Sequence, residues 1–149
     1  MSEIAVITGG TSGIGRATAL YLRDAGYTVY ELSRREQGVE GLHHIRCDIT
    51  DEGQVRAAVA EIMDRAGRID VLVNNAGIMC RDFTTTEDGL EMTVGVNYVG
   101  TWLLTNWLLP NMGKTGKTRI INTSSVTCKM GEIGDHFFEL DPEHYRRFK

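Results

Sequence analysis

The sequence predicts an α/β fold in which helices cover both faces of a doubly wound parallel sheet. At the start of the chain, an uninterrupted apolar run (residues 4–7) passes through a glycine-rich turn into a helical pattern. A strand that is apolar on both faces is typical of a parallel sheet covered on both sides. Further strand-like segments then alternate with helical patterns, as βαβ units require. The expected strands are residues 4–7, 28–33, 43–47, 69–73 and 117–123.

Hydrophobic periodicity marks the helices between these strands. In the first helix, one side carries Ile14, Ala17, Tyr21 and Ala25. The second helix has an N-cap residue in Thr50, acidic residues in its first turn and a terminating glycine at Gly67. Residues 87–112 form a third helical region that is apolar around its circumference, which is typical of a helix buried on more than one side.

The composition is that of an ordinary globular protein. The chain has 149 residues, 42% of them hydrophobic and 24% charged, with a formal net charge of −4, and this length suits a single domain. The mild charge and the lack of a basic stripe or basic amphipathic helix argue against a nucleic-acid partner or a membrane surface. A strand begins within three residues of the N-terminus, which leaves no room for a signal peptide. No apolar run approaches the roughly 18 residues of a membrane span, so we expect a cytoplasmic protein.

No metal site is predicted. The cysteines, at positions 47, 80 and 128, are odd in number and lack the close paired spacing of a zinc site. His43 and His44 are neighbours on a strand and point to opposite faces, so they cannot both bind one metal ion. We interpret the cysteines as reduced thiols and the histidines as structural residues.

The glycine-rich turn after the first strand is suited to binding a pyrophosphate. Its glycines at positions 9, 13 and 15 let the backbone approach a bulky anion closely. The helix behind them offers free N–H groups and the positive end of its dipole. A plain turn is the alternative for a glycine-rich stretch by itself, so this prediction depends on the strand before it and the helix after it.

The end of the second strand indicates which nucleotide is bound. A carboxylate at this place in a dinucleotide-binding unit binds the 2′-hydroxyl of NAD. Here the chain has Ser33, Arg34 and Arg35, with Glu31 on the same strand face as Ser33. An arginine guanidinium is planar, always charged and bidentate, which suits the 2′-phosphate of NADP. The sequence therefore favours NADP(H). NAD(H) is the alternative cofactor if the arginines only form a solvated loop pair.

Several motifs occur together in the order and spacing of one protein family. They are Thr8-Gly9-x-x-x-Gly13-Ile14-Gly15, Asp48, Asn74-Asn75-Ala76-Gly77, Asn97 and the pair Ser124-Ser125. On these motifs the chain resembles the short-chain dehydrogenase/reductases over nearly its whole length. The resemblance implies a Rossmann-type sheet with strand order 3-2-1-4-5. Chains of that family are usually considerably longer, so we expect this one to lack the family's later strands and helices.

The resemblance also implies which residues bind the cofactor. Asp48 would contact the adenine amino group, and Ile49 would line the adenine pocket. Asn75 would in addition tie neighbouring strands together. The predicted cofactor-binding set is Gly9, Thr11, Ser12, Gly13, Ile14, Gly15, Ser33, Arg34, Arg35, Asp48, Ile49, Asn75, Ala76 and Gly77.

The chemistry that the resemblance implies is hydride transfer between a nicotinamide and the carbonyl or alcohol carbon of a small molecule. Ser125 would hold the substrate oxygen, and Asn97 would support a water-borne proton path. A tyrosine hydroxyl would act as general acid/base. Because the ordinary pKa of tyrosine is about 10, a lysine four residues further on would be needed to favour the phenolate.

Tyr145 and Lys149 have this spacing and would share one helix face. They lie farther from Ser125 than the family commonly places them, and Arg146, Arg147 and Phe148 fill a gap where relatives usually carry small and hydroxyl residues. Two interpretations stay open: Tyr145 and Lys149 are the catalytic pair, or Tyr145 lies in an inserted loop and the true pair lies beyond Lys149.

The remaining expectations concern the last segment and the partners. Residues 126–149 lack a strong period and are expected to form an irregular loop, with a helix start marked by Asp141 and Pro142. We expect a homo-oligomer that forms through the outer face of helix 90–111. A hypothesis from a different functional class is a catalytically incomplete module that binds the dinucleotide without turnover.

Overall fold

The computed structural model describes residues 2–113 and 116–126, and this part of the chain has the predicted α/β architecture. The strands are β1 (Ile4–Thr8), β2 (Thr28–Ser33), β3 (His43–Arg46), β4 (Val71–Asn74) and β5 (Arg119–Asn122). The helices are α1 (Gly13–Asp24), α2 (Glu52–Ala66), α3 (Met92–Val94), the π-helix η1 (Gly95–Gly100), α4 (Thr101–Leu108) and the 3-10 helix η2 (Leu109–Asn111).

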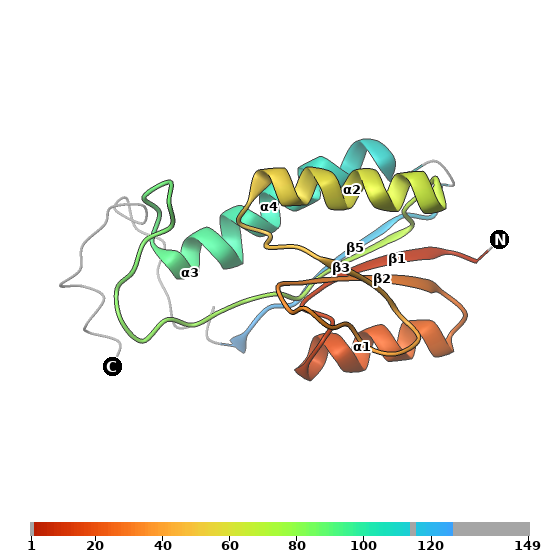
Figure 1. The fold of residues 1–149 in the computed structure, drawn as a ribbon, viewed down its shortest axis with the longest axis horizontal. Helices are drawn as coiled ribbons and strands as arrows, with labels where there is room; N and C mark the ends of the chain where they lie inside the picture. Colours follow the sequence, from red (N-terminus) through yellow and green to blue (C-terminus); the bar gives the residue numbers. More distant parts are fainter. Residues whose placement is uncertain (1, 114–115, 127–149) are drawn as a thin grey trace.

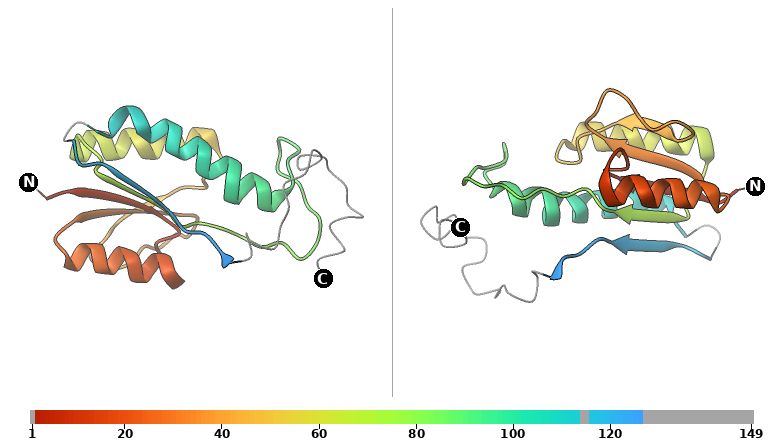
Figure 2. Two further views of the ribbon diagram at one scale, coloured as in Figure 1. Left: turned by 180° about the vertical axis from the view of Figure 1, so that it is seen from behind. Right: turned by 90° about the horizontal axis from the view of Figure 1, so that it is seen from below.

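The strands form one parallel sheet in the order β3-β2-β1-β4-β5, which confirms the predicted strand order. Helix α1 lies on one face of this sheet, and α2 and α4 lie on the other (Figures 1 and 2). The strand order reverses beside β1, because β2 and β4 pair with its two edges. In an open α/β sheet, ligands bind at such a reversal, outside the carboxyl ends of the strands.

The core lies on both faces of the sheet, and β1 is at its centre. All five residues of β1 are buried. Ala5 and Ile7 point to the α1 side, where they pack with Ala19 of that helix. Ile4 and Val6 belong to the larger cluster on the opposite face, which includes buried residues of α2 and α4. This two-sided burial explains the continuous apolar run that predicted the strand.

The apolar side that the sequence marks on α1 is not the side that is buried against the sheet. Ile14 and Tyr21 are 69% and 74% exposed, whereas the buried residues of the helix are Gly15 and Ala19. The physical reason is the close approach of α1 to the sheet: a side chain on Gly15 would collide with the backbone of Gly9. Small residues therefore face the sheet in the first two turns of the helix, and Leu22 packs against the same core cluster further along it.

The start of α2 is also corrected by one residue. Asp51, and not Thr50, is the N-cap, and its carboxylate accepts a hydrogen bond from the Gln54 amide at 3.0 Å. This bond and a second one from the Gln54 side chain lower the pKa of Asp51. Thr50 instead donates its hydroxyl to Asp48 at 2.8 Å. The helix ends at Gly67, as predicted, in a left-handed conformation.

The predicted helix over 87–112 begins later than expected and is not uniform. Residues 87–91 form a turn in which Gly89 has a φ of 79°, and the helical region starts at Met92. Glu91 caps this start by accepting hydrogen bonds from the backbone N–H groups of Thr93 and Val94. The left-handed glycine explains why the helix cannot extend back to residue 87.

Strand β5 differs from the other strands because all four of its residues are exposed. It pairs in parallel with β4, and it is shorter than the predicted strand over 117–123. The expected irregular loop after residue 126 and the helix start at Asp141 and Pro142 lie outside the described residues.

Candidate functional site

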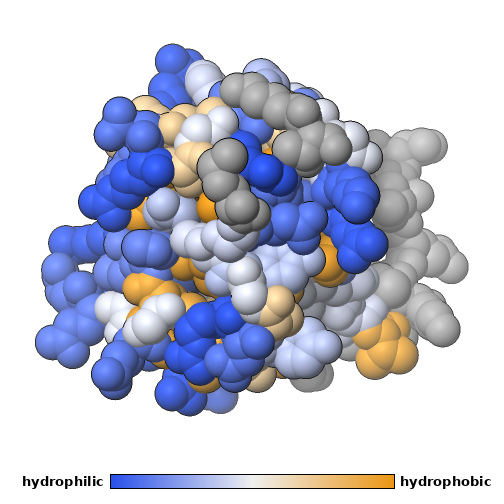
Figure 3. Space-filling model, turned by 90° about the vertical axis from the view of Figure 1, so that its right-hand side faces the viewer, coloured by the Kyte–Doolittle hydropathy of each residue, from blue (hydrophilic) through white to orange (hydrophobic). Residues whose placement is uncertain are grey.

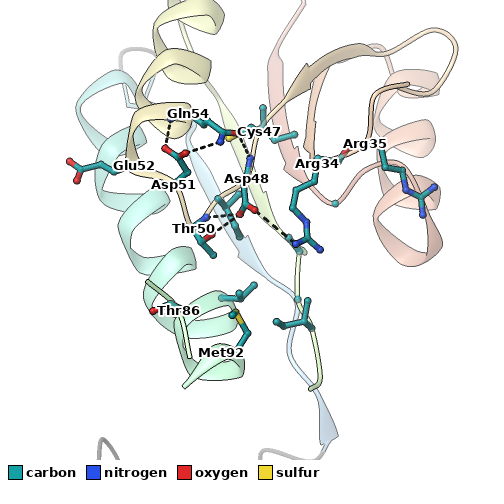
Figure 4. A pocket seen from close by; sticks show the side chains of 18 of the residues that line it. Arg34, Arg35, Cys47, Asp48, Thr50, Asp51, Glu52, Gln54, Thr86 and Met92 are labelled. Atoms are coloured by element: carbon teal, nitrogen blue, oxygen red, sulfur yellow. Dashed lines mark hydrogen bonds and ion pairs between the residues drawn. The ribbon is translucent and has the colours of Figure 1, made fainter. Parts of the chain in front are cut away.

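A cleft of about 990 Å³ opens at the carboxyl ends of the strands, beside the point where the strand order reverses. Its walls come from the glycine-rich turn, the loops after β2, β3 and β4, and the first residues of α2 and α3 (Figure 4). The predicted cofactor residues that line it are Gly9, Thr11, Ser12, Ser33, Arg34, Arg35, Asp48, Ile49, Ala76 and Gly77.

The glycine-rich turn presents the start of α1 to this cleft. Gly9 and Gly13 have φ values of 70° and 54°, a conformation that glycine adopts readily and other residues rarely. Added carbon at Gly13 would meet nothing within 4 Å, so the space in front of it is open. The N-cap residue Ser12 makes no side-chain hydrogen bond to the helix. The helix N-terminus is thus left available to an anion.

Gly13, Ile14, Gly15 and Asn75 do not line the cleft, although they were predicted to bind the cofactor. The last two pack beneath it, because the Asn75 amide lies where a side chain on Gly15 would have to go. Asn75 also donates from Nδ2 to the Thr8 carbonyl at 3.1 Å.

Thr8, the last residue of β1, joins β1 to the loop after β4. Its hydroxyl oxygen accepts hydrogen bonds from the backbone N–H groups of Asn75 at 2.9 Å and Ala76 at 2.8 Å. Thr8 itself is 1% exposed, and Asn75 and Ala76 are partly buried. The bonds fix Ala76 and Gly77 as one wall of the cleft.

The loop after β2 supplies positive charge to the cleft. The Arg34 guanidinium lies 3.9 Å from Asp48 Oδ2, and its side chain is 72% exposed. Figure 4 shows Arg34 extending toward Asp48, whereas the Arg35 side chain points away from it. Ser33 Oγ is buried and has no hydrogen-bond partner among the described residues. A ligand with a phosphate or hydroxyl group beside Ser33 and Arg34 would satisfy both groups.

Asp48 is held in place by the start of α2. Its Oδ1 accepts hydrogen bonds from the Thr50 amide at 3.0 Å and from the Thr50 hydroxyl at 2.8 Å. Its backbone N–H donates to Gln54 Oε1 at 3.0 Å. The neighbouring Cys47 is 1% exposed, and its burial raises the pKa of the thiol to about 11. Cys47 is therefore a packing residue of the cleft and not a nucleophile.

Asn97 lies in the π-helix η1 and forms hydrogen bonds with the loop after β4. Its Oδ1 accepts a hydrogen bond from the Ile78 N–H at 2.8 Å, and its Nδ2 donates to the Ile78 carbonyl at 2.7 Å. A side chain on Gly77 would lie 3.3 Å from Asn97 Oδ1. The side-chain amide of Asn97 is thus engaged in positioning this loop, and its part in a proton path stays a prediction.

Only Asn97 and Ser125 of the predicted catalytic set lie within the described residues. Ser125 follows β5, is exposed, and does not line the cleft. Tyr145 and Lys149 lie outside the described residues. Ten of the residues predicted to bind the cofactor thus share one cleft. Their role in binding, and the arrangement of the catalytic residues, stay predictions.

Some lining residues were not predicted from the sequence. Gln54 had a detectable signal, since Asp51 followed three residues later by glutamine matches a helix-capping pattern. Residues 85–88 had none, because residues 85 and 86 fell in a predicted loop and residues 87 and 88 inside a predicted helix. The unpredicted lining residues are Leu32, Cys47, Thr50, Asp51, Glu52, Gly53, Gln54, Ile78, Thr85, Thr86, Glu87, Asp88, Met92 and Val96.

The observed geometry fits the dinucleotide that the sequence predicts. An open helix N-terminus, a buried serine hydroxyl and an arginine lie on one elongated cleft. At the opposite end of the sheet, where the strands begin, the visible surface is largely hydrophilic with scattered apolar residues (Figure 3). Within residues 2–113 and 116–126, no helix has the length and apolarity that a bilayer crossing needs.

Comparison with known proteins agrees with this geometry. A family model described as short chain dehydrogenase matches residues 3–137. Retinol dehydrogenase 11 of Mus musculus is 35% identical over 156 residues, which cover 96% of this chain and 49% of that protein. The chain thus spans about half the length of this relative.

Solved structures are similar over most of this chain. The 3-ketoacyl-(acyl-carrier-protein) reductase from Brucella melitensis complexed with NADH aligns with a TM-score of 0.75 and 28% identity, covering 91% of this chain and 62% of that one. ElxO with NADP bound aligns with a TM-score of 0.75 and 30% identity, covering 93% of this chain and 61% of that one.

Proposed function

Because this chain belongs to the short-chain dehydrogenase family, we propose that it is an NADP(H)-dependent oxidoreductase acting on a small carbonyl or alcohol compound. The observation that carries the proposal is the cleft in which Arg34 lies beside the buried, unpartnered hydroxyl of Ser33. No acidic residue stands at position 33 or in the two positions after it. One similar structure contains NADH and another NADP, so the preference for NADP(H) depends on these residues of the chain itself.

Each part of the cleft has a proposed role in holding the cofactor. The N–H groups at the start of α1 bind the pyrophosphate. Arg34 and Ser33 bind the 2′-phosphate, since a guanidinium and a hydroxyl both donate to phosphate oxygens. Asp48 and Ile49 contact the adenine, and the wall at Ala76 and Gly77 leaves room for a ribose.

The reacting end is proposed from the family and from sequence positions. When bound, the nicotinamide ring supplies or accepts the hydride. Ser125 holds the substrate oxygen, and Tyr145 exchanges a proton with it while Lys149 stabilises the phenolate. If the true tyrosine and lysine lie beyond residue 149, Ser125 keeps its role and Tyr145 has none.

Cofactor choice is tested by replacing Arg34 with alanine. We expect the Kd for NADPH to rise about tenfold, because one charge-assisted contact is lost, and the Kd for NADH to change less than about twofold. Titration of NADPH and NADH fluorescence measures both constants. Arg65→Ala is the matched control, since Arg65 forms an exposed ion pair with Glu61 on α2, away from the cleft. Equal weakening of both nucleotides by Arg34→Ala would remove the proposed preference.

A second candidate is a module that binds the dinucleotide without turnover. It is favoured by the coverage of 49% of the mouse relative. The two candidates are separated by mixing the chain and NADPH with aldehydes and ketones, including retinaldehyde, and following the loss of nicotinamide absorbance. Saturable binding without absorbance loss would favour the module.

The proposal also includes self-association. Tyr98, Trp102 and Leu109 are 57%, 59% and 47% exposed on the helical region from η1 to η2. Large exposed apolar side chains on one element mark an interaction site. A homo-oligomer through this surface is expected, and sedimentation of the chain with and without Trp102→Glu measures it.

A further inference from the structure

Glu31 is a carboxylate buried directly behind the cleft. It lies in β2, in register with Ile7 of β1 and His44 of β3, and it is 0% exposed. Its Oε1 contacts His44 Nδ1, and its Oε2 has no hydrogen-bond partner among the residues that the structure describes. An uncompensated buried charge is strongly unfavourable. The contact with His44 must therefore compensate the charge of Glu31.

The second ring nitrogen of His44 determines how this compensation works. His44 Nε2 lies 3.0 Å from the backbone carbonyl oxygen of Arg35. A carbonyl only accepts hydrogen bonds, so Nε2 carries a hydrogen and donates it. The contact between Nδ1 and Glu31 Oε1 then holds one proton, on either atom. In both arrangements the Glu31–His44 pair is neutral overall.

The pair lies between the glycine-rich turn and the loop after β2, both of which line the cleft. Gly10 of the glycine-rich turn packs over Glu31, since a side chain on Gly10 would come within 2.6 Å of Glu31 Cβ. Gly38, in the loop after β2, packs over the other side: its added carbon would collide with His44 and lie 3.3 Å from Glu31 Oε1. The pair thus touches both the phosphate-binding turn and the loop that carries Arg34.

We propose that Glu31 and His44 are positioning residues for recognition of the 2′-phosphate. His44 holds the carbonyl of Arg35 and so fixes the loop from which Arg34 extends. This inference rests on the proposed preference for NADP(H).

The test compares Kd values for NADPH and NADH in variants of the full chain. His44→Leu removes both hydrogen bonds and leaves Glu31 uncompensated. We expect its Kd for NADPH to rise about tenfold and its Kd for NADH to change less than about twofold. Glu31→Gln is the conservative variant, because its amide can donate to Nδ1 while Nε2 still donates to Arg35. It should keep both constants within about twofold of the unmodified chain.

Two controls separate positioning from general stability. His43→Leu changes the neighbouring histidine, which stacks on Tyr30 with ring centroids 4.8 Å apart, and it should leave the ratio of the two Kd values unchanged. In a chain already carrying Arg34→Ala and Arg35→Ala, the further change His44→Leu should no longer affect NADPH selectively, since the residues that it positions are gone.

The outcomes distinguish this inference from the function on which it rests. Equal binding of both nucleotides by the unmodified chain and by Arg34→Ala would overturn the NADP(H) preference and this inference together. If the unmodified chain prefers NADPH and His44→Leu weakens binding of both nucleotides equally, or of neither, the positioning role alone is overturned. If His44→Leu does not fold, nitrogen-15 NMR of the unmodified chain decides: a protonated Nε2 on His44 supports the role, and a bare Nε2 overturns it.

Discussion

Two strands flank β4, and they differ completely in burial. In β1 all residues are buried, whereas in β5 all are exposed. Both are parallel to β4 and both are in register with Val73, β1 through Ile7 and β5 through Ile121. The same backbone pairing thus occurs once inside the core and once at its margin. The difference indicates that β1, which leads to the glycine-rich turn, is supported by a packed core. The strand β5, which leads to Ser125, is held mainly by its hydrogen bonds to β4.

The largest expected effect tests this contrast directly. Ile7→Ala should lower the free energy of unfolding by about 3 kcal/mol, because Ile7 is 0% exposed and its removal leaves a cavity. Ile121→Ala should lower it by less than about 1 kcal/mol, because Ile121 is 47% exposed. Urea unfolding followed by circular dichroism measures both. Similar losses would break the comparison, since β5 would then be covered in solution by another surface.

An intermediate effect on the free energy of unfolding is expected from the side-chain hydrogen bonds at the ends of β1 and β5. Thr8→Val keeps the shape but removes the acceptor of two partly buried N–H groups, so we expect a loss of about 2 kcal/mol, about 1 kcal/mol for each hydrogen bond, together with weaker nucleotide binding. Thr8→Ser retains the hydroxyl and is the control.

On the β5 side, Asn122 Oδ1 accepts a hydrogen bond from Asn74 Nδ2 at 2.8 Å. Asn122 is exposed, so Asn122→Ala should cost less than about 1 kcal/mol because water can replace it. If Asn122→Ala lowered the free energy of unfolding more than Thr8→Val does, the end of β5 would depend on its polar contact more than the end of β1 does, which would contradict the comparison.

The smallest expected change in the free energy of unfolding concerns α2 and α4, the helices that cover the larger core cluster on one face of the sheet. Arg56 of α2 lies over the Trp107 ring of α4, 3.9 Å from its centroid. Arg56→Gln should lower the unfolding free energy by about 0.5 kcal/mol and change the tryptophan fluorescence, because a cation–π contact is lost. Arg65→Gln on the same helix serves as the control, since Arg65 pairs with Glu61 at the surface. Indistinguishable fluorescence in the two variants would argue that the Arg56 contact does not persist in solution.

The parts of the fold that could be predicted are those determined by local sequence. Buried parallel strands require apolar residues on both faces, and a phosphate-binding turn requires glycines, so both leave a readable pattern over a few residues. The strand order came from the resemblance of several such motifs to a known family. The strands and their order were predicted correctly. That the glycine-rich turn binds phosphate stays a prediction.

The parts that could not be predicted depend on distances between segments. Which side of α1 is buried depends on how closely the helix approaches the sheet, so the small residues Gly15 and Ala19 face inward where Ile14 and Tyr21 were expected. The link between Glu31 and His44 depends on the register of β2 with β3. The sequence identified His44 only as a structural residue, because nothing local to it indicates a carboxylate thirteen positions earlier.

The π-helical turn at Gly95–Gly100 has a consequence for how this chain tolerates insertions and deletions. Such a turn holds one residue more than an α-helical turn would, so the sequence after it is out of phase by about 100° with the sequence before it. The offset lets Asn97 form hydrogen bonds with the Ile78 backbone while Leu104 and Leu108 stay buried in the core. Deleting one residue in this stretch would turn the π-helical turn into an α-helical one, and then either the Asn97–Ile78 hydrogen bonds or the apolar contacts of Leu104 and Leu108 would be lost.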